Sequence, residues 1–176
     1  MNLQHSPTSR LYTTMFLYVL VSLFPILCSG QDQLLLDSLL STLNTHSHDS
    51  SKVNTLNELA WELRIANPEK ATSYANEAKE ISQSLEYPSG FLTSLNRLGV
   101  IAFYKKDFPK AESLYLEILE GEKKQNNRFG IGRAHNQLGE IYKNMGDHQK
   151  AIEHASNSLE IFTAIDRWDL VAVVTT

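Results

Sequence analysis

The sequence contains a single cysteine, Cys28, and no cysteine follows it. Beyond that position the chain therefore lacks the side chains for disulfide bonds, thiolate zinc sites or a cysteine nucleophile. An excess of basic residues is missing too, because 16 Lys and Arg stand against 20 Asp and Glu, for a formal net charge of -4. Nucleic-acid binding normally requires a basic face, so we predict no nucleic-acid partner.

Motifs of catalytic and cofactor sites are also missing. The chain has no phosphate-binding glycine loop, no His-Glu-x-x-His and no Gly-x-Ser-x-Gly. Gly130 and Gly132 lie close together in "RFGIGRAHNQLG", but no strand precedes them, and we interpret this stretch as the start of a helix. We predict that the protein is not an enzyme and carries no cofactor.

Histidines provide one candidate metal site. The stretch "HSHD" could place His46, His48 and Asp49 around a metal ion, but the segment is serine-rich and lies between two predicted helices, which favours a solvated loop. The other histidines of the helical region are expected to form no cluster; they are His135, His148 and His154. We therefore predict no bound metal.

The N-terminal segment 1–30 differs in character from the rest. One basic residue, Arg10, precedes an uncharged apolar stretch, and the small residues Cys28 and Gly30 come before a cleavage position after Gly30. This order is typical of a secretory signal peptide. If it is not cleaved, residues 11–30 are just long enough to anchor the chain in a membrane. In both cases we expect the remainder to be exported, on the periplasmic or extracellular side.

An internal repeat is the strongest pattern in the sequence. A leucine followed by a small residue recurs at intervals of 39 and 40 residues, in the pairs Leu59-Ala60, Leu98-Gly99 and Leu138-Gly139. A period in this range is typical of stacked helical arrays. The small residue is expected to let the two helices of a unit pack closely.

A helix start follows each of these pairs. The predicted N-caps are Asn67, Asp107 and Asp147, since their side-chain oxygens can accept from free backbone N–H groups of the first turn. Pro68 suits a first turn, and Gly146 would let the preceding helix end in a left-handed conformation.

The helical spacing of apolar residues, with few residues that favour strands, predicts an all-α fold, an α-solenoid of stacked antiparallel helix pairs. We expect a leading helix and a polar loop within residues 31–51, and an array over 52–176. The helix pairs are predicted at 52–86, 90–126 and 130–164, in repeats at 52–89, 90–129 and 130–169, followed by the start of a truncated fourth repeat.

Residues Asn136–Ala151 read N-x-Leu-Gly-x-x-Tyr…Gly-Asp-x-x-Lys-Ala and resemble the tetratricopeptide repeat (TPR). The unit is longer than the usual ~34 residues, similar to the long-helix subclass of bacterial peptide-responsive regulators and kinesin light chains. The array also resembles the exported arm of bacterial signalling proteins. In those proteins a membrane helix and a histidine kinase, nucleotide cyclase or helix-turn-helix output domain follow it.

Asparagine recurs two residues before each repeat leucine, at Asn57, Asn96 and Asn136. Asparagine is unfavourable inside helices, and either inheritance through duplication or a function would explain it. A carboxamide can pair with a peptide group, and the resemblance implies that these helices line a concave groove. The other candidate groove residues are Trp61, Arg64, Phe103, Arg133, Glu140 and Lys143.

For the aromatic candidates Trp61 and Phe103, packing between repeats is an equally good explanation. The basic candidates Arg64, Arg133 and Lys143 are expected to favour acidic groups of the ligand. We thus predict a non-catalytic scaffold that binds a peptide or protein segment. The alternatives are the sensor arm of a transmembrane signalling protein, whose output domain follows this segment, and a module for self-association.

Overall fold

The computed structural model describes residues 34–43 and 49–166. The predicted signal peptide, His46, His48 and the start of a fourth repeat lie outside these residues. The chain divides into two compact units, Met1–Ser41 and Thr42–Thr176, and residues 34–43 are helical. Among the residues described, no helix is both long and apolar enough to span a bilayer.

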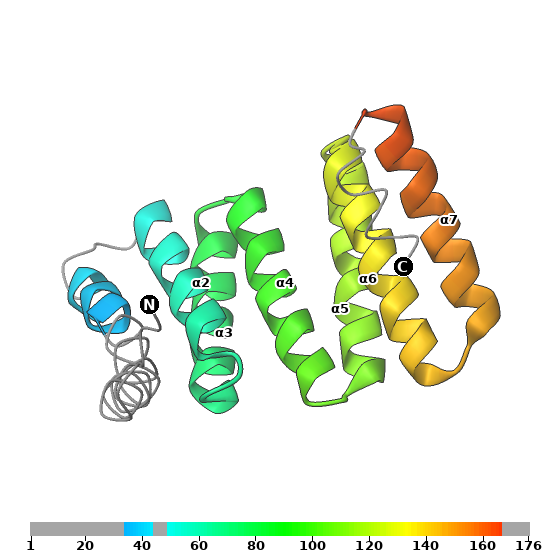
Figure 1. Ribbon diagram of the computed structural model, residues 1–176. Helices are drawn as coiled ribbons and strands as arrows, with labels where there is room; N and C mark the ends of the chain where they lie inside the picture. The colour runs from blue at the N-terminus through cyan, green and yellow to red at the C-terminus, as the bar shows by residue number, and fades with distance from the viewer. Residues whose placement is uncertain (1–33, 44–48, 167–176) are drawn as a thin grey trace, which may run out of the picture. The chain divides into compact units, whose positions relative to one another are not determined.

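The second unit is an array of helices in which every described helix packs against the next (Figure 1). The helices form antiparallel pairs, α2 with α3, α4 with α5, and α6 with α7, and α2 also packs against α4. No strand occurs in the described residues, so the predicted all-α solenoid is confirmed. The helices are α2 (Ser50–Leu63), α3 (Pro68–Ser84), α4 (Pro88–Tyr104), α5 (Phe108–Lys124), α6 (Arg128–Met145) and α7 (His148–Ala164).

The predicted N-caps are confirmed. The side chains of Asn67, Asp107 and Asp147 each accept a hydrogen bond from the backbone N–H three residues later, at 3.1, 3.3 and 3.2 Å. A fourth cap, which sequence reasoning missed, is Asn127, which accepts from Gly130 N at 3.2 Å. Side-chain caps therefore begin α3, α5, α6 and α7.

The start of α2 was predicted two residues too late. Asp49 Oδ1 accepts from the backbone N–H groups of Ser51 and Lys52 at 2.9 and 3.1 Å, so the helix begins at Ser50. This use of the Asp49 carboxylate as an N-cap also accounts for its place in the polar "HSHD" stretch.

A left-handed residue follows each helix from α3 to α7, at a constant interval of 20 residues, half the repeat. Gly146 has φ 81°, as predicted, and the other four residues have φ between 49° and 60°; they are Glu86, Lys106, Asn126 and Asp166. After α3, α4, α5 and α6 a backbone N–H of the following residue bonds back into the last turn, for example Asp107 N to Ala102 O at 2.9 Å. This is the Schellman end that reverses the chain.

Removing one N-cap tests how much the turns contribute to stability. Asp107→Ala is expected to lower the free energy of unfolding by about 0.5–2 kcal/mol, because Lys110 N–H at the start of α5 loses its acceptor. Urea denaturation followed by circular dichroism measures this change. Glu117→Ala, at an exposed position of the same helix, is the matched control and should change stability by less than about 0.5 kcal/mol. Equal effects of the two substitutions would contradict the capping role.

The small residues of the repeat pairs serve two different kinds of close contact. A Cβ added to Gly139 would lie 3.4 Å from the Ala151 carbonyl oxygen, so the backbones of α6 and α7 approach each other closely, as predicted. A Cβ added to Gly99 would instead lie 2.8 Å from the ring of Tyr115. In the middle repeat, therefore, the glycine of α4 makes room for an aromatic side chain of α5.

Candidate functional site

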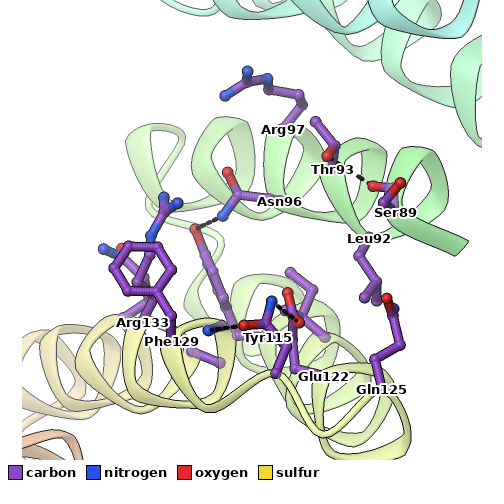
Figure 2. Close-up of a pocket in the computed structure, with 15 residues that line it drawn as sticks. Ser89, Leu92, Thr93, Asn96, Arg97, Tyr115, Glu122, Gln125, Phe129 and Arg133 are labelled. Carbon is purple, nitrogen blue, oxygen red and sulfur yellow. Dashed lines mark hydrogen bonds between the residues drawn. The ribbon is translucent and has the colours of Figure 1, made fainter. Parts of the chain in front are cut away.

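A pocket of about 400 Å³ lies between α4, α5 and α6 (Figure 2). It forms at a place in the described array where the first helices of two neighbouring pairs are not packed together. The first helices of neighbouring pairs, α2 and α4, are packed together, whereas no comparable packing joins α4 and α6 among the described helices. We call this space the central pocket. Its lining residues are Ser89, Leu92, Thr93, Asn96 and Arg97 from α4, Tyr115, Ile118, Glu122 and Gln125 from α5 and its end, and Asn127, Phe129, Gly130, Arg133, Ala134 and Gln137 from α6 and its cap.

Asn96 and Tyr115 form the middle of the central pocket. Asn96 Nδ2 donates to the Tyr115 hydroxyl at 3.2 Å (Figure 2), while the Tyr115 side chain is 1% exposed and its ring fills the space left by Gly99. Burial raises the pKa of Tyr115, against the opposing effect of nearby positive charges. The phenol is therefore neutral, and the half-buried carboxamide of Asn96 keeps its oxygen available as an acceptor.

Three arginines lie beside this pair, and we call them the arginine cluster: Arg64, Arg97 and Arg133. The guanidinium of Arg64 lies 3.7 Å from the centre of the Trp61 ring and that of Arg97 lies 4.7 Å from it. Arg97 Nε also donates to the Asn57 carbonyl oxygen at 3.1 Å. These contacts fix Arg97 between α2 and α4, where cation–π attraction and a backbone acceptor hold its side chain.

The arginines of the cluster are not in ion-pair contact with a carboxylate among the described residues. Burial, followed by the charges of Arg133 and Arg64, lowers the pKa of Arg97, although the charge of Glu58 acts on Arg97 from a distance and raises its pKa. The cluster is thus a local positive region in a chain whose formal net charge is -4.

Glu122 lies in another part of the central pocket and is held by two features of the α6 N-terminus. Asn127 Nδ2 donates to Glu122 Oε2 at 2.8 Å. Gly130 leaves the space in which the carboxylate lies, because an added Cβ there would overlap its oxygens. The first turn of α6 also favours negative charge. Glu122 makes no ion pair with Lys or Arg among the described residues.

Four of the predicted groove residues lie in or beside the central pocket. Asn96 and Arg133 line it. Trp61 and Arg64 do not line it, but the Trp61 ring is in contact with Arg97, which does. One repeat asparagine and one predicted basic residue, Asn96 and Arg133, therefore line the same pocket between the second and third helix pairs.

Asn57 is placed differently from Asn96, although the two occupy the same position in their repeats. Its side chain is 2% exposed, and Nδ2 lies 3.5 Å from the Gly90 carbonyl oxygen of α4. Its Oδ1 has no hydrogen-bond partner among the described residues. Ligand contact by Asn57 stays a prediction, and the burial of this side chain between α2 and α4 argues against it.

The remaining predicted groove residues lie away from the central pocket. Phe103 packs edge-on against Phe108 at a centroid distance of 5.7 Å. Glu140 and Lys143 are exposed on α6 and their charged atoms lie 3.6 Å apart. Asn136 is half-buried and is not part of the pocket lining. The three repeat asparagines, which were predicted to be equivalent, thus lie in three different environments.

Sequence reasoning missed Arg97, Tyr115 and Glu122. A signal for Tyr115 exists, because the positions 40 residues before and after it are Ala75 and Ala155. A large ring at a position that is otherwise alanine indicates that the packing of the middle repeat differs from that of its neighbours. Arg97 and Glu122 carry no such signal, because only the contacts between helices place them at the pocket.

Two of the three histidines that were expected to be scattered over the helix faces lie side by side. His135 Nδ1 and His154 Nδ1 lie 3.0 Å apart, and the His154 ring also packs on Tyr142 with a centroid distance of 5.2 Å. Burial and the neighbouring His154 lower the pKa of His135 to about 4, and burial lowers the pKa of His154. No group of three or more potential metal ligands occurs in the described residues.

Comparisons with known proteins agree on the fold. A tetratricopeptide repeat family model matches residues 90–164. The crystal structure of BtubC (BKLC) from P. vanneervenii has a TM-score of 0.63 and 24% sequence identity, over 68% of this chain and 50% of that one. The apo form of RapI has a TM-score of 0.72 and 18% identity, over 83% of this chain and 42% of RapI. The chain thus spans half or less of the length of these structures, and the search of curated proteins found no match.

Proposed function

Because residues 90–164 are tetratricopeptide repeats, as their sequence resemblance had predicted, we propose that this chain is a non-catalytic scaffold. We infer that it binds a peptide or protein segment at the central pocket. Arrays of this kind present extended surfaces between stacked helix pairs, and the central pocket opens at such a position, between the second and third pairs.

The observation that carries this proposal is the arginine cluster without carboxylate partners. Charges that are partly removed from water gain from an opposite charge and from hydrogen bonds. Arg97 is half-buried, whereas Arg133 is exposed. The Arg133 guanidinium lies 5.9 Å from the centre of the Phe129 ring, and its charge acts on Arg97 and Tyr115. An acidic ligand would provide the missing partner for Arg133.

The central pocket combines this charge with hydrogen-bonding groups suited to a peptide. Asn96 presents its carboxamide oxygen next to the neutral Tyr115 phenol, and Gln137 adds a second carboxamide from α6. A volume of about 400 Å³ falls in the lower part of the ~300–1,000 Å³ typical of ligand sites. It therefore suits a few residues of an extended chain rather than a folded domain.

Binding of short acidic peptides, measured by isothermal titration calorimetry, tests the proposal. Arg133→Gln is expected to weaken binding about tenfold, through loss of a charge-assisted contact. Arg128→Gln is the matched control, since Arg128 is exposed on the same helix and does not line the pocket. If acidic peptides fail to bind the wild-type protein, or if both variants bind equally well, the central pocket is not the site.

Substitutions of Asn96 and Asn136 distinguish binding at the central pocket from binding along a continuous row of repeat asparagines. Asn96→Ala should weaken binding about two- to tenfold, the equivalent of one neutral hydrogen bond, whereas Asn136→Ala should leave affinity unchanged. Helicity should stay the same in both variants. An equal loss with Asn136→Ala would favour the ladder along the first helices over the central pocket.

A further inference from the structure

The central pocket contains both signs of charge, and the protein does not pair them with each other. Arg97 and Arg133 line it together with Glu122, yet no ion pair joins Glu122 to either arginine. Figure 2 shows Arg133 and Phe129 on one side of Tyr115, and Glu122 and Gln125 on the other. The pocket is therefore dipolar, with a positive region and a negative region on either side of Tyr115.

We propose that the central pocket selects a dipolar ligand: a peptide whose primary ammonium group lies against Glu122 and whose acidic group lies against Arg97 and Arg133. This inference rests on the proposed function and adds to it the charge pattern of the ligand. A purely acidic peptide would satisfy the arginines but would bring negative charge towards the carboxylate of Glu122.

The position of Glu122 is built into the structure, which distinguishes it from a freely moving surface carboxylate. Asn127 donates to one of its oxygens at 2.8 Å, and the absence of a side chain at Gly130 leaves room for the carboxylate against the first turn of α6. The hydrogen bond occupies Oε2, so Oε1 remains free to accept from an ammonium group. A carboxylate already held in place loses little conformational freedom when it binds a ligand.

Of the two arginines that line the pocket, Arg97 is the one held in place by a hydrogen bond. Arg97 donates to the Asn57 carbonyl oxygen through Nε at 3.1 Å, which leaves its terminal nitrogens as donors. Arg133 is exposed, and its guanidinium lies 5.9 Å from the centre of the Phe129 ring. Between the two charged regions, Asn96 offers an acceptor for a peptide N–H. A short peptide with an ammonium group at one end and a carboxylate further along would match this order.

Peptides that differ only in charge pattern test the inference. The probes are free-amino peptides with one acidic residue at the second, third or fourth position, their N-acetylated twins, and an N-acetylated peptide that carries a lysine at its first position. We expect the best free-amino probe to bind about tenfold more tightly than its acetylated twin, as for one charge-assisted contact. The lysine probe shows whether a side-chain ammonium is accepted in place of the N-terminal one.

Glu122→Gln should abolish this preference without abolishing the binding of the acetylated acidic peptides. The matched control is Glu120→Gln, which removes the same charge from an exposed position on the same helix and should leave the preference intact. Circular dichroism checks that both variants are folded. In the wild-type protein, the preference for free-amino over N-acetylated peptides should also decrease as the pH rises above the α-amino pKa of about 8.

The outcomes separate this inference from the proposed function. If acetylated and free peptides bind equally to the wild-type protein, or if the preference persists in Glu122→Gln, the dipolar inference is wrong. If the dipolar inference fails in this way but Arg133→Gln still weakens peptide binding, the proposal of a peptide-binding scaffold stands without the dipolar inference. If no probe binds at all, both are wrong.

Discussion

Replacing Tyr115 with alanine is expected to lower the free energy of unfolding by about 3–5 kcal/mol, as for other large buried side chains. The residue is 1% exposed and belongs to the largest core cluster, which also contains Ile118, Leu138 and Tyr142. Its removal leaves a cavity beside Gly99, where no side chain is present to fill the space. Urea denaturation followed by circular dichroism measures the loss.

Tyr115→Phe separates the contribution of the ring from that of the hydroxyl. This variant keeps the packing and removes only the acceptor for Asn96, so we expect a loss of about 0.5–1.5 kcal/mol. Since the same hydroxyl helps to orient Asn96 in the central pocket, peptide affinity should fall with it. A loss below about 1 kcal/mol for Tyr115→Ala would contradict the packing described for the middle repeat.

The histidine pair between α6 and α7 is expected to make stability depend on pH. The folded chain holds the pKa of His135 at about 4, whereas the ordinary value is 6.5. Between these values the unfolded chain binds a proton that the folded chain excludes, so stability falls as pH decreases from 6.5 towards 4. Because His135 is only half-buried, we discount the full linkage and expect a loss of about 1–2 kcal/mol across this window.

The neighbouring groups modify this dependence without reversing it. Lys123 disfavours a charged His135, whereas Glu153 favours it. Around His154, Glu153 and Glu112 raise the pKa while Lys150 lowers it. In both histidines burial is the largest effect, because each imidazole is packed against the other ring between two helices.

The preceding repeat shows which substitution removes the pH dependence. Forty residues earlier, Leu95 and Leu114 occupy the positions of His135 and His154. A double His135→Leu and His154→Leu variant should be as stable as the wild type above pH 6.5 and more stable near the lower end of the window. Thermal denaturation across this range measures the difference.

His148→Leu is the matched control for the histidine pair. His148 is exposed at the start of α7, so its replacement should leave the pH dependence of stability as in the wild type. If the double variant loses stability on acidification as steeply as the wild type does, the carboxylates of the array, rather than the histidines, cause the effect.

Sequence periodicity was most informative where the structural cause is local. N-caps, the turn at Gly146 and the close approach at Gly139 involve residues within a turn or between paired helices, and all three were predictable. The same reasoning did not predict the contact between His135 and His154, which lie 19 residues apart on different helices. Their contact depends on how α6 and α7 are rotated against each other, and repeat spacing alone does not give that rotation.

The asparagines show the same limit within the candidate site. Equivalent positions predicted one shared role, yet Asn57 is buried against α4, Asn96 is bonded to Tyr115, and Asn136 lies outside the central pocket. The difference arises because the helices of successive pairs are not packed alike. A position in a repeat specifies the direction of a side chain, but the neighbouring helix decides what that side chain meets.

The amino-acid sequence by itself determined that this protein is an array of capped, antiparallel helix pairs, because caps, turns and apolar spacing act over a few residues. Only the tertiary structure decided that a pocket opens between α4 and α6 and that Arg97, Arg133 and Glu122 line it. Those side chains come from different helices, and their separation depends on the size of buried groups such as Tyr115. The physical reason is that packing acts over distances in space, which repeat spacing along the chain does not record.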